Sequence, residues 1–134
     1  MTSTLAPVRP ASADYAVYSL LGAIGAGTLD GAVACFTREG CLVTPDGTAV
    51  HGRDGIRSLI SQMIASRTEI EVEQLVLRRA GDVVLGTGRM TMRFSGPEGS
   101  RVTRVCEPMV VLRLVEEWWK VAILAPWSAN RPVT

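Results

Sequence analysis

The sequence has little of what many catalytic and metal sites require. It contains one histidine, His51, which excludes a site built on two imidazoles. Its 3 cysteines are odd in number and form no C-x-x-C pair, so neither a disulfide framework nor a zinc site is indicated. The two common glycine-rich phosphate-binding motifs are missing, so nothing favours a nucleotide, nicotinamide or flavin. The sequence therefore predicts a protein that uses no metal and no cofactor.

An excess of one charge and long apolar runs are missing too. Lys and Arg total 14 and Asp and Glu total 13, which gives a net charge of +1 and no reason to expect nucleic acid or an acidic membrane surface as a partner. No run approaches the roughly 20 apolar residues of a membrane span. Residues 1–10 lack the charged start and apolar run of a secretory signal, and the cysteine usage suits reduced thiols. We therefore expect a cytoplasmic protein that binds neither membranes nor nucleic acid.

What is present suits one folded domain. The chain has 134 residues, of which 47% are hydrophobic and 20% charged, a composition that argues against disorder. A domain of this size buries roughly two-thirds of the surface that its unfolded chain exposes. We expect a flexible lead over residues 1–11, one domain over 12–128 and a tail over 129–134.

The first half of the sequence predicts three helices and a small hairpin. Apolar residues recur at helical spacing over 12–25 and again over 53–65. A shorter helix is expected from about Thr28 to Phe36, with Gly40 as its stop. Between the second and third helices, 41–44 and 48–50 read as short strands joined by a Pro-Asp-Gly turn.

The second half changes to the two-residue period of strands. Long strands are expected up to residue 80 and over 83–94, 101–115 and 118–128. The phase slips between Val72 and Leu75, which predicts a β-bulge. Strands of this length exceed the usual 5 or 6 residues and must twist and curl. The predicted fold class is α+β: a strongly curved, mixed, mainly antiparallel sheet that forms a cone around three N-terminal helices and leaves an apolar pocket.

Residues 109–112 are apolar on both strand faces, whereas a strand with one wet face alternates. Something must therefore cover the convex side of the sheet. An overhanging loop or terminus would do so, and a second copy of the chain would do so as well. We favour the second copy, which predicts a homodimer through the convex face.

Two stretches resemble a known superfamily. The run from Cys35 to Gly47, with Phe-Thr, a Glu-Gly pair and Pro-Asp-Gly, is followed by Gly-Arg-x-x-Ile at 52–56. With Trp119-Lys120-Val121 near the end, this pattern resembles the nuclear transport factor 2-like (cystatin-like) superfamily, and within it the SnoaL-like, SgcJ/EcaC-type branch. The resemblance implies a curved-sheet cone, commonly a homodimer, with an internal pocket. Several such relatives serve polyketide or enediyne antibiotic pathways; others are isomerases, cyclases, hydratases, epoxide hydrolases or binding modules.

The ketosteroid isomerases of this superfamily provide a test of mechanism. They carry a carboxylate base just before the proline of the first-strand loop, where this sequence has Thr44, and a protonated Asp where a rough alignment places Val110. A threonine cannot act as a base at neutral pH. Two of the three parts are missing, so we reject that mechanism. Only the tyrosine of their first helix has possible counterparts here.

Five residues are candidates for catalysis. Tyr15 and Tyr18 could present hydroxyl donors to a ligand carbonyl, or could pack their rings in the core. Asp46 and His51 flank the small hairpin and could relay a proton, or could be a turn residue and a strand-end residue. Glu107 could pair with an arginine across the convex face, or could be a buried acid.

Seven further residues are candidates for contact with an apolar ligand. Flexible sulfur side chains suit irregular ligands, and they suit irregular cores equally well. Of the tryptophans at 118 and 119, strand alternation sends one inward and one outward. The candidates are Leu59, Met63, Met90, Met92, Cys106, Trp119 and Trp127.

These observations lead to two hypotheses of function. The first is a pocket protein for an apolar polyketide or enediyne-type intermediate, with cofactor-free isomerase, cyclase or dehydratase chemistry. The second is a non-catalytic dimer that binds or shields such a molecule. They differ in whether ionisable groups lie inside the cone, because proton transfer requires a positioned acid or base.

Overall fold

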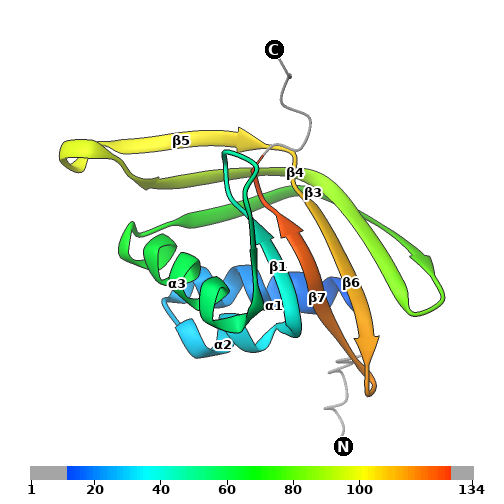
Figure 1. Ribbon diagram of the computed structural model, residues 1–134. Helices are drawn as coiled ribbons and strands as arrows, with labels where there is room; N and C mark the ends of the chain where they lie inside the picture. Colours follow the sequence, from blue (N-terminus) through cyan, green and yellow to red (C-terminus); the bar gives the residue numbers. More distant parts are fainter. Residues whose placement is uncertain (1–11, 128–134) are drawn as a thin grey trace, which may run out of the picture.

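The computed structural model describes residues 12–127, and the segments expected at 1–11 and 129–134 lie outside this range. Three α-helices come first with a small hairpin among them, and long strands follow (Figure 1). The elements are α1 (Ala13–Ala26), α2 (Leu29–Ala34), β1 (Phe36–Val43), β2 (Ala49–His51), α3 (Gly52–Ala65), β3 (Glu69–Ala80), β4 (Val83–Ser95), a 3-10 turn η2 (Pro97–Gly99), β5 (Arg101–Cys106), β6 (Met109–Val115) and β7 (Trp118–Ala125). Within residues 12–127, none of the helices combines the length and apolar character needed to cross a bilayer.

The α1 helix shows how the local sequence sets an element. It buries a stripe made of Ala16, Val17, Leu20 and Ile24, which recur at helical spacing. Gly27 ends it with φ at 78°, a left-handed conformation that glycine adopts without a Cβ clash. The helix therefore begins and ends within two residues of the predicted bounds.

The region after α2 differs from the prediction. The second helix was expected to reach Phe36, but it ends at Ala34, and β1 begins at Phe36. Phe36 is completely buried and pairs with Val121 of β7, whose amide donates to the Cys35 carbonyl at 2.8 Å. Pairing with a distant strand thus overrides the helical spacing of this short segment.

The strands form one seven-stranded mixed sheet. Its order is β2-β1-β7-β6-β4-β3, with β5 paired to the far part of β4. The β1–β7 pair is parallel and the other pairs are antiparallel. The register of β3 against β4 shifts between Val72 and Gln74, where the bulge was predicted. The mixed, mainly antiparallel sheet with three helices confirms the predicted fold class.

The strand expected over 101–115 is in fact two strands. β5 ends at Cys106 and β6 begins at Met109, and both pair with β4 at different places. The break falls at Glu107 and Pro108, and a proline cannot donate a hydrogen bond to a ladder. Likewise β7 ends at Ala125, before the predicted residue 128.

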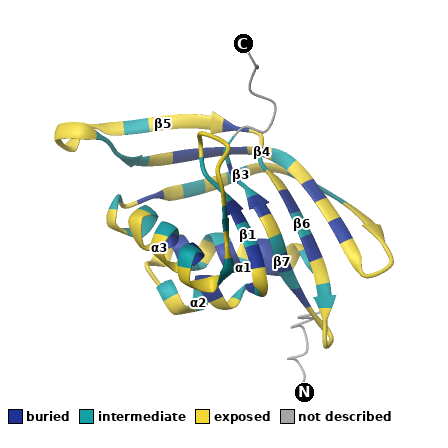
Figure 2. Ribbon diagram, in the orientation of Figure 1, coloured by how far each residue is buried: buried dark blue, intermediate teal, exposed yellow. Residues whose placement is uncertain are grey.

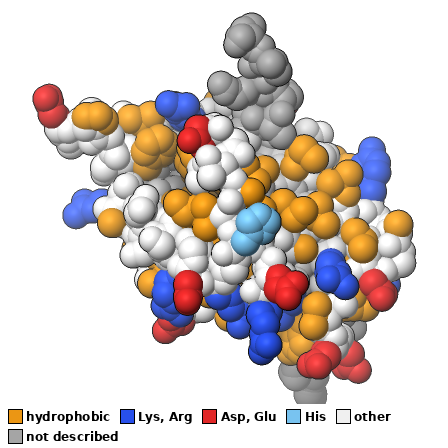
Figure 3. Space-filling model, viewed as in Figure 1, with side chains coloured by type: hydrophobic (Ala, Val, Ile, Leu, Met, Phe, Trp, Pro, Cys, Tyr) orange, Lys and Arg blue, Asp and Glu red, His pale blue; other side chains and the backbone are white. Residues whose placement is uncertain are grey.

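The main core lies between the helices and the inner face of the sheet (Figure 2). Its completely buried members include Phe36, Ile56, Leu112 and Val121. The outer face is different, because large apolar side chains stay exposed there, among them Leu85 on β4 and Ile123 on β7. Hydrophobic side chains gather over the outer surface in Figure 3. Within residues 12–127, the sheet is therefore covered by helices on one face and left bare on the other.

Candidate functional site

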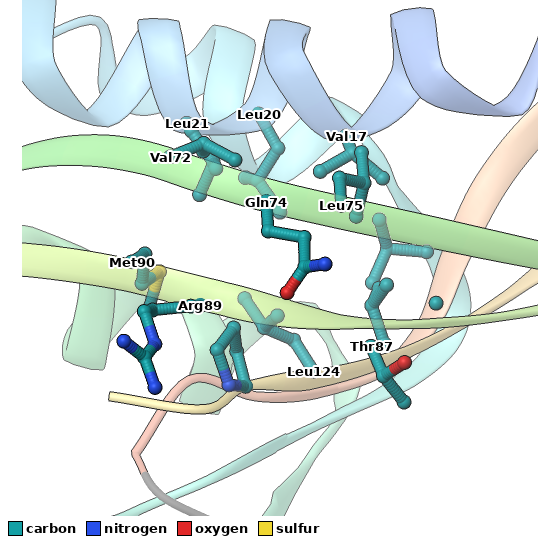
Figure 4. A pocket seen from close by; sticks show the side chains of 14 residues that line it. Val17, Leu20, Leu21, Val72, Gln74, Leu75, Thr87, Arg89, Met90 and Leu124 are labelled. Atoms are coloured by element: carbon teal, nitrogen blue, oxygen red, sulfur yellow. The ribbon is translucent and has the colours of Figure 1, made fainter. Parts of the chain in front are cut away.

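An apolar cavity lies between α1 and the inner face of the sheet. Val17, Leu20 and Leu21 point into it from α1 (Figure 4). The sheet supplies the rest of the wall: Val72, Gln74, Leu75, Gly86, Thr87, Arg89, Met90, Pro108, Val110, Val121 and Leu124. The predicted internal pocket therefore exists, and α1 with β3 and β4 forms most of its wall.

The cavity is small. Its volume is about 40 Å³. A water molecule needs roughly 10–15 Å³ on this measure, so the cavity has room for about three groups of the size of a water molecule. Pockets for drug-sized ligands span about 300–1,000 Å³. As it stands, the cavity accepts a short apolar end of a molecule, and a larger guest requires side chains to move.

The lining of this cavity carries little acid–base chemistry. Its polar side chains are those of Gln74, Thr87 and Arg89. Among the described residues that line it there is no Asp, Glu, His, Tyr or Lys. A guest in this space would therefore meet hydrocarbon, one sulfur, one amide, one hydroxyl and one guanidinium, and no group that titrates near neutral pH.

Sulfur side chains meet beside the cavity. Met90, Met92 and Cys106 form a buried cluster, against which Met63, Ile70, Phe94 and Trp127 pack. The register explains the meeting, because Met90 pairs directly with Cys106 across β4 and β5. The predicted convergence of the sulfur residues is confirmed. We call these seven side chains the sulfur cluster.

A second hollow, the mouth groove, opens on the other side of the sulfur cluster. Its volume is about 230 Å³. Leu59, Met63 and Trp127, three of the predicted contact residues, line it, together with Leu42, Thr44, Pro45, Gln62, Ser66, Thr68, Phe94 and Pro126. The rings of Phe94 and Trp127 meet edge to face, with centroids 6.4 Å apart. Met63 thus reaches the mouth groove and Met90 reaches the inner cavity, so flexible side chains are what separates the two spaces.

The remaining predicted contact residues belong to the core. Met92 is completely buried and Cys106 is nearly so. Trp119 faces inward and is buried, while Trp118 is half exposed, which confirms that the two rings point to opposite sides. Trp119 packs in the main core and does not line the inner cavity.

The two tyrosines lie on the outer side of α1. Each has a relative exposure of 50%. Tyr15 borders a shallow hollow with Trp118 and Trp119, and neither tyrosine lines the inner cavity. The structure therefore does not bring their hydroxyl groups to the apolar cavity.

Asp46 and His51 are exposed at the two ends of the small hairpin. The Asp46 carboxylate accepts hydrogen bonds from the Thr44 hydroxyl and from the Thr48 amide. These bonds, the Thr44 hydroxyl first, lower the pKa of Asp46. A carboxylate held in its charged form is a weaker base, whereas an effective general base has a pKa near the working pH. Asp46 acts as a turn residue, and His51 directly precedes α3.

Glu107 lies on the outer face of the sheet. Its carboxylate is 3.9 Å from the Arg89 guanidinium, and the side chain is about half exposed. The predicted pairing with an arginine is confirmed, and the alternative of a buried acid is wrong. The acid is exposed because the break between β5 and β6 places it on the water side.

The cysteines do not form a nucleophilic site. Burial raises the pKa of the Cys106 thiol, with a smaller opposing effect of Arg104. Burial raises the pKa of Cys35 as well. Both thiols therefore stay protonated at neutral pH. Within the described residues, no three His, Cys, Asp or Glu side chains converge as metal ligands.

The sequence reasoning missed the polar residues of the cavity wall, Gln74, Thr87 and Arg89. One signal could have identified Gln74: the phase slip after Val72, since a bulge re-aims the neighbouring side chains. Arg89 looked like an ordinary outward residue of an alternating strand. Only its position opposite Glu107 and Pro108 makes it part of a site.

Comparison with known proteins agrees with this architecture. Residues 17–120 match the family model for the SnoaL-like domain. No curated protein matches in sequence. Among solved structures, a candidate dehydratase of the nuclear transport factor 2-like family from Streptomyces avermitilis superposes with a TM-score of 0.76 at 15% identity, covering 87% of this chain and 93% of that one.

Two further solved structures show the same fold. A candidate calcium/calmodulin-dependent protein kinase II association domain from Xanthomonas campestris has a TM-score of 0.75 at 11% identity, covering 87% of this chain and 84% of that one. SalBIII, an epoxide hydrolase/cyclase-like enzyme of pyran ring formation in the polyether salinomycin, has a TM-score of 0.70 at 19% identity, covering 87% and 90%. At these identities the likeness shows the fold alone.

Proposed function

The chain belongs to the SnoaL-like domain family, and from this premise we propose that it binds and shields an apolar small molecule without acid–base catalysis of its own. One observation carries the proposal. The apolar cavity has no Asp, Glu, His, Tyr or Lys among its described lining residues, while the five candidate catalytic residues lie outside it. Proton transfer needs a donor or acceptor within hydrogen-bond reach of the guest.

The interior can enlarge for a guest. Methionine has three rotatable side-chain bonds and a polarisable sulfur, so it adapts to irregular shapes. Met63 and Met90 lie between the mouth groove and the inner cavity, with Met92 behind them. Rotation of these side chains would join the two spaces without a change in the backbone.

The guest we propose is an apolar polyketide or enediyne-type intermediate of natural-product biosynthesis. The hydrocarbon and sulfur lining supports a carbon-rich guest. The shared fold with SalBIII, which acts in polyether formation, is in keeping with this class. Isomerase, cyclase or dehydratase chemistry is the competing proposal, and it requires an acid or base that reaches the guest.

Methionine methyl NMR tests the proposal. With 2-acetylnaphthalene, a bicyclic aromatic ketone, as probe, the methyl signals of Met63, Met90 and Met92 should shift together and saturate. A variant with Val17→Ile and Val110→Ile adds two methylene groups to the cavity wall and should weaken binding about tenfold or more. The absence of any shift in the three signals, or unchanged binding by the filled variant, would overturn the proposal.

We also propose a second copy of the chain as the partner on the outer face. Leu85 pairs with Val111, and Val111 pairs with Ile123, so an apolar row crosses three strands on the bare side. A two-fold axis places such a row against the same row of the second copy. The net charge of +1 causes little electrostatic repulsion between the two copies. The solved relative described as an association domain is in keeping with assembly through this fold.

Sedimentation tests this partner. The wild type should sediment as a dimer, and a variant with Leu85→Lys and Val111→Lys should sediment as a monomer because charges directly opposite their copies repel. A wild type that sediments at the 14.4 kDa monomer mass at micromolar concentration would rule the dimer out.

A further inference from the structure

A larger groove lies on the outer face of the sheet, opposite the inner cavity. Its volume is about 380 Å³. Its lining residues include Gln74, Thr87, Arg89, Glu107, Pro108 and Met109. We call it the outer groove. It is several times larger than the inner cavity and more polar in its side chains.

The outer groove and the inner cavity share part of their walls. Gln74, Thr87, Arg89 and Pro108 line both. In Figure 4 the amide of Gln74 points away from α1, into the space between Arg89 and Thr87. The two spaces are therefore separated by these side chains and by the short stretch of sheet that carries them.

The hydrogen-bonded sheet is interrupted at this stretch. The β4–β6 ladder ends at Thr87, and the β4–β5 ladder begins at Met90, so neither includes residues 88 and 89. Pro108 opposite them has no N–H to donate. On the other side of β4, the register of β3 shifts between Val72 and Gln74. Three irregularities thus coincide in the stretch of sheet that the groove and the cavity share as a wall.

Glycine at position 88 is part of this arrangement. A Cβ there would overlap the Gln74 carbonyl oxygen, and no side-chain rotation can relieve this clash because the contacted atom belongs to the backbone. The absence of that side chain lets β3 approach β4 closely at the bulge. The polar side chains of Gln74 and Arg89, which pair in register, remain the movable part of the wall.

The charges of the outer groove balance. Arg89 supplies one positive group and Glu107 one negative group, 3.9 Å apart, which exceeds the 2.7–2.9 Å of a direct charge-assisted hydrogen bond. The guanidinium therefore keeps donors for other acceptors. A carboxylate guest would be attracted by Arg89 and repelled by Glu107, and an ammonium guest the reverse, so the balanced pair offers an ionic head no net attraction to offset the cost of its desolvation. A neutral head with a carbonyl or hydroxyl oxygen carries no charge to desolvate.

We propose that the outer groove is the second half of the ligand site: a guest places its apolar end in the inner cavity and a neutral, oxygenated head in the outer groove, passing through the sheet beside Arg89. The inference rests on the proposed binding function and specifies its guest as an amphipathic neutral molecule. Arg89 and Gln74 donate to the oxygen of the head, and Glu107 accepts from a hydroxyl where the guest has one. The passage lies between residues 88–89 of β4 and Pro108, where neither the β4–β5 nor the β4–β6 ladder includes β4, and rotation of the Arg89 side chain uncovers it.

The outer groove also borders the proposed dimer face. Met109 belongs to both, because it lies two residues from Val111 on β6. Arg89 lies four residues from Leu85 along β4, about 13 Å at 3.3 Å per residue. A second copy centred on the apolar row would therefore reach the Met109 end of the groove before the Arg89 end.

Three probes of equal chain length test the inference: 2-octanone, octanoate and octylammonium. Backbone and methyl NMR titration of the full chain should show 2-octanone shifting signals on both sides of the wall, at Val17 and Leu20 inside and at Val76 and Met109 outside. Octanoate and octylammonium should bind about tenfold more weakly, because each ionic head must be desolvated beside a balanced ion pair that gives it no net attraction. Equal or tighter binding of either ion would overturn the neutral-head assignment.

The chain offers a matched control for Arg89. Arg93 lies on the same face of β4, is comparably exposed, and pairs with Glu71 at 3.8 Å, but it lines neither space. Arg89→Met keeps the alkyl stem and should weaken 2-octanone binding about tenfold, and Arg93→Met should leave it unchanged. Equal effects of the two variants would overturn the role of Arg89.

The two proposals fail in different ways. If the wild type binds no neutral probe, the binding function fails. The binding function stands if 2-octanone binds the wild type and the Val17→Ile, Val110→Ile variant abolishes that binding. The passage through the sheet is nevertheless wrong if Arg89→Met leaves the binding unchanged and the shifts appear at Gln62 and Ser66 in the mouth groove.

Discussion

Arg79 and Trp119 lie face to face across the cone: the guanidinium carbon of Arg79 is 5.1 Å from the centroid of the Trp119 ring. One residue belongs to β3, an edge strand, and the other to β7, near the middle of the sheet. The contact therefore joins two strands that are not neighbours in the ladder, and it is possible only because the sheet curls. The contact thus links an edge strand to the middle of the curved sheet.

Arg79→Ala should lower the free energy of unfolding by about 0.5–1 kcal/mol, the usual contribution of a cation–π contact at a partly exposed site. Arg78→Ala is the control, because Arg78 is exposed on the same strand and contacts no ring in the described structure. Urea unfolding of the two variants measures the difference. An equal change in both would show that the contact with Trp119 contributes nothing.

Gly88→Ala should be strongly destabilising, since the added Cβ meets backbone atoms of Gln74. Gly22→Ala should instead be stabilising, because nothing lies within 4 Å of the added Cβ and alanine is favoured over glycine in a helix by about 0.8–1.0 kcal/mol. Thermal unfolding should therefore give a lower midpoint for the first variant and a higher one for the second. A Gly88→Ala protein as stable as the wild type would contradict the close approach of β3 to β4.

The stability contributed by Asp46 should depend on pH. Its pKa is below the ordinary value of 3.8 in the folded chain, so the charged form is stabilised by folding. That contribution is present above the ordinary value and disappears as the pH falls through the lower folded value. The melting temperature of Asp46→Asn should lie below that of the wild type at neutral pH, and the gap should close in acid. A gap that stays constant down to pH 2 would mean that the charge is not the cause.

The three cysteines should differ in reactivity. Burial raises the pKa of Cys35 and Cys106 above the ordinary value of 9.0, which lowers their thiolate fraction at any given pH. Cys106 is buried, whereas Cys35 and Cys41 are both partly buried. Iodoacetamide at pH 8 should therefore label Cys41 first and Cys106 mainly after unfolding, as measured by peptide mass spectrometry. Labelling of Cys106 in the folded protein at the rate of Cys41 would show that the sulfur cluster opens to solvent.

Residues that act through local chemistry were the predictable ones. The Pro-Asp-Gly turn, the bulge after Val72 and the inward and outward faces of β4 follow from backbone preferences and the two-residue period. Residues 109–112 correctly indicated a sheet whose outer face stays apolar. Each of these features can be recognised in a short window of sequence.

Features that depend on distant partners were not predictable. Phe36 continued a helical spacing, yet it became a strand residue because β7 pairs with it. Pro108 was visible within the apolar strand pattern, but where it breaks the ladder depends on how β4 is shared between β5 and β6. The outward placement of Tyr15 and Tyr18 likewise follows from which face of α1 meets the sheet, since helical spacing alone allowed either tyrosine to face the core.

The parallel pairing of β1 with β7 has a consequence for how the chain folds during its synthesis. β7 is inserted between β1 and β6, although it follows every other strand in the sequence. During translation, β1 and the helices would emerge from the ribosome before β7, so the position of β7 between β1 and β6 would stay unfilled until the end. Contacts between residues so far apart in the sequence slow folding. Because β7 supplies Val121 and Leu124 to the cavity wall, guest recognition would thus begin only after β7 is inserted, and a ligand present earlier in translation would have no complete site to bind.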